Sequence, residues 1–242
     1  MHTWRKDFAD QPAFAHLKPW LDSFNDSDWP DLAALNAFAG SQNLTNANGL
    51  PLRFSPQAIA CGQHEYESVI HASGCVPSRE RNWHDLFNAL IWLAFPETKA
   101  ALNLAHQSAL RPGCNRAPAS DAATLFDESG VALISADAEL IKLLAARRWR
   151  EALVDRRDAW SRISIHVIGH ALLEKMLTPW PGITAKCLFL QMPADSDRAQ
   201  VDAAIAWHWR ESCIPNPATL FPLPLLGIPG WWPPNEDPEF YQ

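Results

Sequence analysis

The order of apolar and polar residues predicts a chain built mainly of short helices. Helical spacing of apolar positions is expected over residues 12–24, 30–39, 66–71, 83–94, 97–110, 137–146, 148–160, 169–177 and 198–210. Short strands are expected over 50–54 and 185–191, and the β-branched stretch 163–168 is ambiguous between strand and helix. The pattern therefore predicts a helix-dominated α+β domain with a few short strands or a β-hairpin.

Local signals place several element boundaries. Asn82 suits the N-cap of the helix over 83–94, and Pro96 suits the first position of the helix after it. The stretch 111–120, which holds two Pro and one Gly, is expected to be a loop. Over 122–135, the run Asp127-Glu-Ser-Gly130 separates two apolar runs, so this stretch is expected to be a β-hairpin with Asp127 and Glu128 in ordinary turn roles.

The last 30 residues differ from the rest. They hold eight of the chain's 20 Pro together with several Leu and Trp, which is too apolar for a disordered linker. We therefore expect a globular domain over 1–212 and an extended C-terminal arm over 213–242 that packs on the body or on a partner. Through this arm the protein would form a homodimer.

Composition narrows the class of protein. Apolar residues make up 48% and charged residues 19% of the 242, which is typical of a globular protein. The net charge of -7 argues against nucleic acid and anionic membranes as partners. Five widely spaced Cys without a C-x-x-C pair, and an N-terminus without a signal-peptide pattern, favour a cytoplasmic location.

The segment from Arg79 to Asn103 carries the densest group of polar side chains. On a regular helix His84, Asp85 and Asn88 fall within about 100° of one another, at an end that favours negative charge. One interpretation is a pocket with a His–Asp acid/base pair or metal ligands, and the other is a capped helix with a surface His. In the first, the groups expected to hold an anionic substrate are Arg79, Arg81, Trp92, Lys99 and Asn103.

A second candidate group lies near the predicted helix 169–177. If residues 163–177 were helical throughout, His166, His170 and Glu174 would share one face and bind a divalent metal. If 163–168 is a strand, only His170 and Glu174 remain as a pair. Gly169 before them would allow close approach of another backbone segment.

Several motifs resemble the bacterial domain of unknown function 3025. They are Tyr66-Glu67, Asn82-Trp-His-Asp-Leu-Phe-Asn88, Phe126-Asp-Glu-x-Gly130, Gly169-His-Ala-Leu-Leu-Glu-Lys175 and Leu225-Leu-Gly-Ile-Pro-Gly-Trp231. The resemblance covers most of the chain and implies a soluble bacterial protein. It implies no particular activity, cofactor or fold. In that family the position of His166 is not a fixed His, which favours His170 with Glu174 as the metal pair.

Two functions follow from these features. The first is a hydrolase-like or proton-transfer enzyme, metal-assisted in one version, whose catalytic residues are His84, Asp85, Asn88, His170 and Glu174. The second is a binding or assembly protein in which the polar cluster is a structural network. The distance between His84 and His170 separates the two, because catalytic groups act within hydrogen-bonding range.

Overall fold

The fold was taken from a computed structural model, which describes residues 3–56, 62–109, 117–210, 216–237 and 239. Its α-helices are α1 (Lys18–Leu21), α2 (Leu32–Ser41), α3 (Gln63–Ser73), α4 (Trp83–Ala94), α5 (Pro96–Ala109), α6 (Ala117–Ser129), α7 (Ala138–Ala145), α8 (His170–Met176) and α9 (Arg198–Arg210). Its strands are β1 (Arg53–Pro56), β2 (Cys75–Ser78), β3 (Gly130–Ile134), β4 (Ser164–Val167), β5 (Thr184–Leu190) and β6 (Phe221–Pro224). Short 3-10 or π turns are η1 (Pro12–Leu17), η2 (Glu151–Asp155), η3 (Arg157–Arg162), η4 (Pro217–Thr219), η5 (Leu225–Gly227) and η6 (Pro233–Glu236). The helix-dominated α+β prediction is confirmed.

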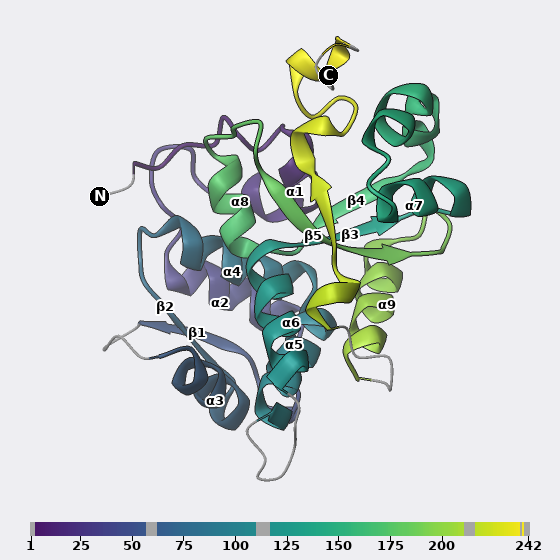
Figure 1. The fold of residues 1–242 in the computed structure, drawn as a ribbon. Coiled ribbons are helices and arrows are strands. Elements are labelled where there is room, and N and C mark those ends of the chain that lie inside the picture. Colours follow the sequence, from purple (N-terminus) through teal and green to yellow (C-terminus); the bar gives the residue numbers. More distant parts are fainter. Residues whose placement is uncertain (1–2, 57–61, 110–116, 211–215, 238, 240–242) are drawn as a thin grey trace.

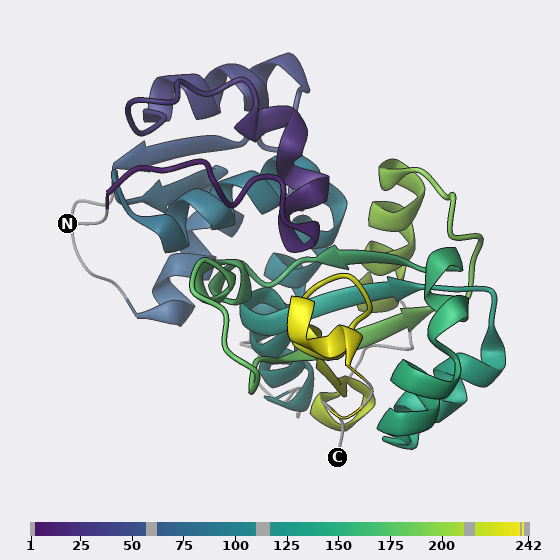
Figure 2. The same ribbon diagram turned by 90° about the horizontal axis from the view of Figure 1, so that it is seen from above.

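Two sheets organise these elements. The larger sheet has the strand order β4-β3-β5-β6, in which β3 and β5 are parallel and both outer strands are antiparallel to their neighbours. All five residues of β3 are buried, as expected for a central strand. Helices α5, α6 and α9 form a group below this sheet in Figure 1. The parallel pair β1–β2 and the N-terminal helices lie to one side of it, as the view from above shows (Figure 2).

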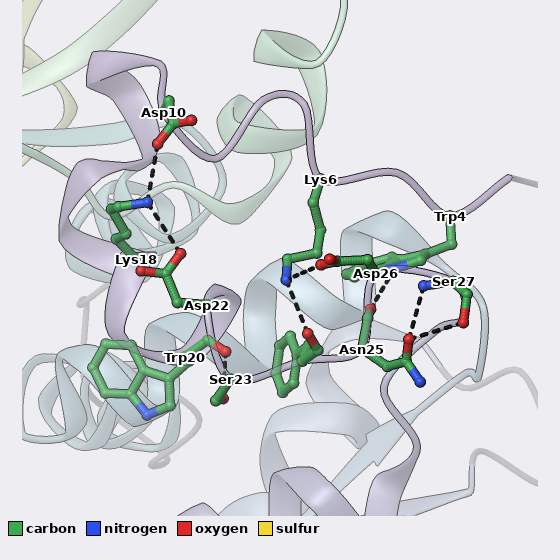
Figure 3. A network of polar contacts seen from close by, with 11 residues as sticks. Trp4, Lys6, Asp10, Lys18, Trp20, Asp22, Ser23, Asn25, Asp26 and Ser27 are labelled. Carbon is green, nitrogen blue, oxygen red and sulfur yellow. Dashed lines mark hydrogen bonds and ion pairs between the residues drawn. The ribbon is translucent and has the colours of Figure 1, made fainter.

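The N-terminal segment is tied to the body by polar contacts (Figure 3). The Lys6 ammonium lies 2.6 Å from Asp26 and also donates to the carbonyl of Phe24. The indole of Trp4 donates to the carbonyl of Asn25, and its ring stacks on Trp83 with centroids 5.3 Å apart. Because Trp83 opens α4, these contacts fix the start of that helix against the N-terminal segment.

The predicted β-hairpin over 122–135 is wrong. Residues up to Ser129 form α6, and only Gly130–Ile134 is a strand. The buried residues Ala122, Ala123 and Phe126 have helical spacing, and burying that face outweighed the turn preference of the residues that follow. Asp127 and Glu128 therefore lie in the last turn of a helix.

Other boundaries agree with the sequence. Helices α4 and α9 match the stretches expected, and the Asn82 side chain accepts a hydrogen bond from the backbone N–H of Asp85 as its N-cap. The ambiguous stretch 163–168 contains strand β4. The stretch expected to be a helix over 148–160 is helical over 149–155, with π geometry in η2, and continues after Arg156 as the 3-10 turn η3. Residues 110–116, most of the loop expected over 111–120, lie outside the described residues.

The C-terminal arm packs on the chain's own body. Strand β6 pairs with β5, and the apolar side chains of Leu220, Leu223, Leu225, Leu226 and Ile228 are buried. The amide of Asn235 closes the arm by donating to the carbonyls of Leu226 and Ile228. The boundary expected at residue 213 lies outside the described residues.

A close backbone contact joins the end of α6 to the start of α8. The amides of Ile168 and Gly169 both donate to the carbonyl of Gly130 at 2.9 Å. A Cβ atom at Gly169 would lie 2.6 Å from the backbone of Ser129 and Gly130. Only glycine allows this approach without backbone movement, as the sequence suggested.

We expect Gly169→Ala to lower the free energy of unfolding by about 1–3 kcal/mol, because the added methyl group meets rigid backbone. Urea denaturation measures the change. Gly40→Ala is the matched control, since a Cβ there meets nothing within 4 Å and α2 should gain up to about 1 kcal/mol. A Gly169→Ala protein as stable as the wild type would contradict the steric argument.

Candidate functional site

Three helix ends bring His84, Glu128 and His170 together. His84 lies in the first turn of α4, Glu128 in the last turn of α6, and His170 begins α8. One ligand atom from each side chain lies within 4.8 Å of the other two. The Nε2 atoms of the two imidazoles are 3.0 Å apart, and Glu128 Oε2 is 3.7 Å from that of His170. We call these three residues the centre.

Each imidazole turns its other nitrogen toward a second carboxylate. His84 Nδ1 is 3.3 Å from Glu174 Oε2, and His170 Nδ1 is 3.9 Å from Asp127 Oδ2. The two rings are nearly perpendicular, with an interplanar angle of 76°. Histidine ligands in metal sites show this arrangement, with one nitrogen on the ion and the other facing a carboxylate or carbonyl.

The spacing fits a metal ion. Metal–nitrogen distances of about 2.0–2.1 Å at a tetrahedral angle separate two ligand nitrogens by roughly 3.3 Å. The observed 3.0 Å between Nε2 atoms is close to this separation. Without an ion the same distance is a hydrogen bond in which one ring donates to the other.

The centre is open on one side and buried on the other. The side chains of His84, Glu174 and Glu128 are 31%, 35% and 39% exposed, whereas that of His170 is only 5% exposed. Burial lowers the pKa of His170 to about 3, so the ring is neutral and available as a ligand near neutral pH. Burial also raises the pKa of Glu128, and the charge of Asp127 adds to this effect.

Asp127 is held by a buried lysine. Lys99 Nζ donates to Asp127 Oδ1, and both side chains are nearly inaccessible. The same ammonium lies 5.6 Å from the centroid of the Trp92 ring. Burial by itself raises the pKa of Asp127, but Lys99, through its charge and its hydrogen bond, together with the nearby His170 and His106 outweighs this effect, so the pKa is lowered and the carboxylate stays ionised.

Asp85 is occupied by Arg79 rather than by His84. Its carboxylate accepts hydrogen bonds from the Arg79 backbone N–H at 2.6 Å and from Nε and Nη2 at 2.8 Å. This bidentate pair raises the pKa of Arg79 and leaves its side chain 54% exposed. Arg81, in a left-handed conformation at φ 55°, lies 3.6 Å from Asp28 at the surface.

The amides predicted for the site lie in a buried polar layer. The side-chain amide of Asn88 donates to the Tyr66 hydroxyl at 2.8 Å. That of Asn103 donates to Glu67, to the carbonyl at 2.9 Å and to Oε2 at 2.6 Å. Burial raises the pKa of Glu67. These groups link α3 to α4 and α5.

The structure thus brings together only part of the predicted set. His84, His170 and Glu174 meet, while Asp85, Asn88, Trp92, Lys99 and Asn103 are engaged elsewhere. Of the predicted metal pair, His170 lies at the centre, whereas Glu174 faces Nδ1 of His84, the nitrogen that points away from His170. Sequence reasoning missed Glu128 and Asp127 as site residues, because the hairpin prediction assigned them to a turn.

His166 belongs to a different cluster. As a strand residue of β4 it lies away from the centre, and its ring is 5.9 Å from that of His16 in η1. Burial, with a contribution from His166, lowers the pKa of His16 to about 3, and burial lowers the pKa of His166 to about 4. The three-ligand face that required His166 is therefore wrong.

Comparison with known proteins identifies the family. Residues 52–242 match the model of the family described as "Protein of unknown function (DUF3025)", and the chain belongs to that family. No curated protein and no solved structure matches. Within the described residues, none of the helices has both the length and the apolar character that crossing a bilayer requires.

The His16–His166 pair predicts acid sensitivity. Both rings are neutral in the folded protein down to about pH 4, whereas in the unfolded chain they protonate near 6.5. These rings therefore do not lower the free energy of unfolding above pH 6.5. As the pH falls below 6.5, the free energy of unfolding decreases by up to about 1.4 kcal/mol per pH unit for each ring. Urea denaturation between pH 7 and 4.5 should show a smaller loss for the double variant His16→Gln/His166→Gln. Equal losses in both proteins would argue against this assignment.

Proposed function

We propose that this DUF3025 protein is a metal-assisted hydrolase whose ion is held by His84, Glu128 and His170. One observation carries the proposal: two imidazoles and a carboxylate, all groups that bind metal ions, come from three different helices and lie within 4.8 Å of one another at a partly exposed position. Two His and one Glu form a ligand set used by catalytic metal sites. Three protein ligands also leave a coordination position for water or substrate.

Each side chain would have a separate task. His84 and His170 would bind through Nε2 and Glu128 through a carboxylate oxygen. Glu174, on the outer nitrogen of His84, would fix the tautomer and direction of that ring. A divalent ion bound there would act as a Lewis acid and lower the pKa of water. Imidazole and carboxylate ligands suit Zn, Mn or Fe. The buried Cys187 lies in β5 and does not add a thiolate ligand to this group.

An anionic substrate fits the surroundings of the centre. Arg79 is more than half exposed, and the pKa of its guanidinium is raised chiefly by Asp85 and also by the charge of Glu174. Arg79 is therefore within electrostatic range of Glu174, and Asp85 fixes the direction of its guanidinium. A guanidinium held in this way can pair with a carboxylate or phosphate. Lys99 and Trp92 have less support in this role, because both are buried.

The non-enzymatic alternative has less support. An assembly role rested on an apolar arm free to engage a partner, but the arm's leucines are packed on this chain's own sheet. A homodimer through the arm has the same weakness. A cytoplasmic location in a bacterium remains part of the proposal and rests on cysteine usage and the family resemblance.

Metal content tests the proposal. We expect about one equivalent of Zn, Mn or Fe in purified protein, and metal-dependent hydrolysis of nitrophenyl phosphate or nitrophenyl acetate. His84→Gln, Glu128→Gln and His170→Gln should each weaken metal binding by more than about 100-fold, since losing a direct ligand costs more than losing an outer partner. Glu139→Gln on α7 is the control, because this exposed carboxylate forms an ion pair with Lys142 of the same helix.

Two results would contradict different parts of the proposal, the metal site and the reaction class. Protein that contains no metal, and gains no thermal stability when Zn, Mn or Fe is added, would remove the metal site. A stoichiometric metal site without hydrolysis of either probe or of related esters and amides would remove the reaction class.

A further inference from the structure

We propose that Asp127, held in place by Lys99, is a positioning residue that orients His170 at the centre. The inference rests on the proposed metal site and concerns a residue pair that binds neither the ion nor the substrate. Three features support it: the directions of the two Asp127 oxygens, the burial of the Lys99–Asp127 pair, and the buried Nδ1 atom of His170, which lacks a hydrogen bond of good geometry.

The two oxygens of Asp127 face different groups. Oδ1 accepts a hydrogen bond from Lys99 Nζ, and Oδ2 faces His170 Nδ1 at 3.9 Å. Lys99 comes from α5 and Asp127 from α6, so the carboxylate is hydrogen-bonded to a side chain of a neighbouring helix. It cannot turn away from His170 without breaking the bond to Lys99.

His170 needs a partner at that nitrogen. When Nε2 binds a metal, the neutral ring carries its proton on Nδ1. Nδ1 is buried, and within the described part of the chain it makes no hydrogen bond of good geometry, although the main chain of Asp127 also lies near the ring. A buried N–H donor without an acceptor is unfavourable, so a small rotation of the ring toward Oδ2 is expected when the ion binds. Asp127 would then fix both the tautomer and the direction of Nε2.

The environment of this pair distinguishes it from Glu174. Glu174 faces the outer nitrogen of His84 but is 35% exposed, so water competes for its oxygens. The Asp127 and Lys99 side chains are 12% and 5% exposed. At the centre, His84 thus has a solvated partner, Glu174, that can adjust its position, whereas His170 has a rigid partner, Asp127.

Stability alone does not account for a buried ion pair. Replacing such a pair by apolar groups of similar size is often neutral or stabilising, because two charges no longer have to be desolvated. A pair that also orients a metal ligand has a function that apolar residues cannot supply. The competing explanation is that the pair only holds α5 against α6.

Metal affinity and the visible spectrum of bound Co²⁺ separate these explanations. We expect Asp127→Asn to weaken Zn²⁺ and Co²⁺ binding about 10–100-fold, the usual effect of losing an outer partner of a ligand, and to change the Co²⁺ absorption bands. The double variant Lys99→Met/Asp127→Asn removes both charges of the pair. It should fold and show the same weakened affinity and altered bands.

Asp202→Asn is the matched control. Asp202 is also a buried aspartate, and it accepts hydrogen bonds from the backbone N–H groups of Glu97 and Thr98 at the start of α5. This substitution disturbs the helix that carries Lys99 without touching Asp127. It should lower stability while metal affinity and the Co²⁺ spectrum stay those of the wild type.

The outcomes distinguish this inference from the proposed function. Wild-type protein that binds neither Zn²⁺ nor Co²⁺ overturns both. If the wild type binds them and Asp127→Asn keeps the same affinity and spectrum, only the positioning role is overturned. Recovery of wild-type affinity in the double variant would also overturn it, since the defect would then come from an unpaired Lys99. If Asp127→Asn does not fold, the double variant decides alone.

Discussion

The backbone contact between Gly130 and Gly169 is the constraint on which the rest of the site depends. It joins the end of α6 to the start of α8, where the carbonyl of Gly130 accepts hydrogen bonds from two successive amides. A side chain at Gly169 would separate these ends. Because Asp127 and Glu128 lie just before one glycine and His170 just after the other, this approach sets their distances. The pairing of β3 with β4 holds the same two segments together farther along.

The surroundings of the centre show how buried carboxylates are provided with hydrogen-bond donors. Asp127 is paired with Lys99, and Asp85 takes three hydrogen bonds from Arg79. Asp202 lies against the first amides of α5, where the helix dipole favours a carboxylate. Glu67 accepts a hydrogen bond from the Asn103 amide, and burial raises its pKa although Lys99 and His106 nearby act against this. Each of these acids thus contacts a helix end, a side-chain amide or a cation, and these contacts hold together the helices that carry the centre.

Local signals in the sequence predicted most of the helices, but not α6, and two of the three residues of the centre. The N-cap Asn82 and the break before Pro96 defined α4, and with it the place of His84. Near Gly130 the same local logic failed, because an Asp-Glu-Ser-Gly run suits a turn between strands as well as the end of a helix. The choice between them depended on burying Ala122, Ala123 and Phe126 against the body. That packing is a tertiary contact, which local sequence signals do not reveal, so Glu128 was not predicted as a site residue.

The two acidic residues that local analysis assigned to a turn take different tasks because they are successive residues of a helix. Consecutive side chains on a helix point about 100° apart. Asp127 is directed inward, to Lys99 and the outer nitrogen of His170, while Glu128 is directed to the partly exposed side where the two imidazoles meet. In a hairpin turn both would face solvent. The helical end of α6 therefore supplies one residue of the centre and the carboxylate that faces another, so three segments of the chain are enough to form the centre.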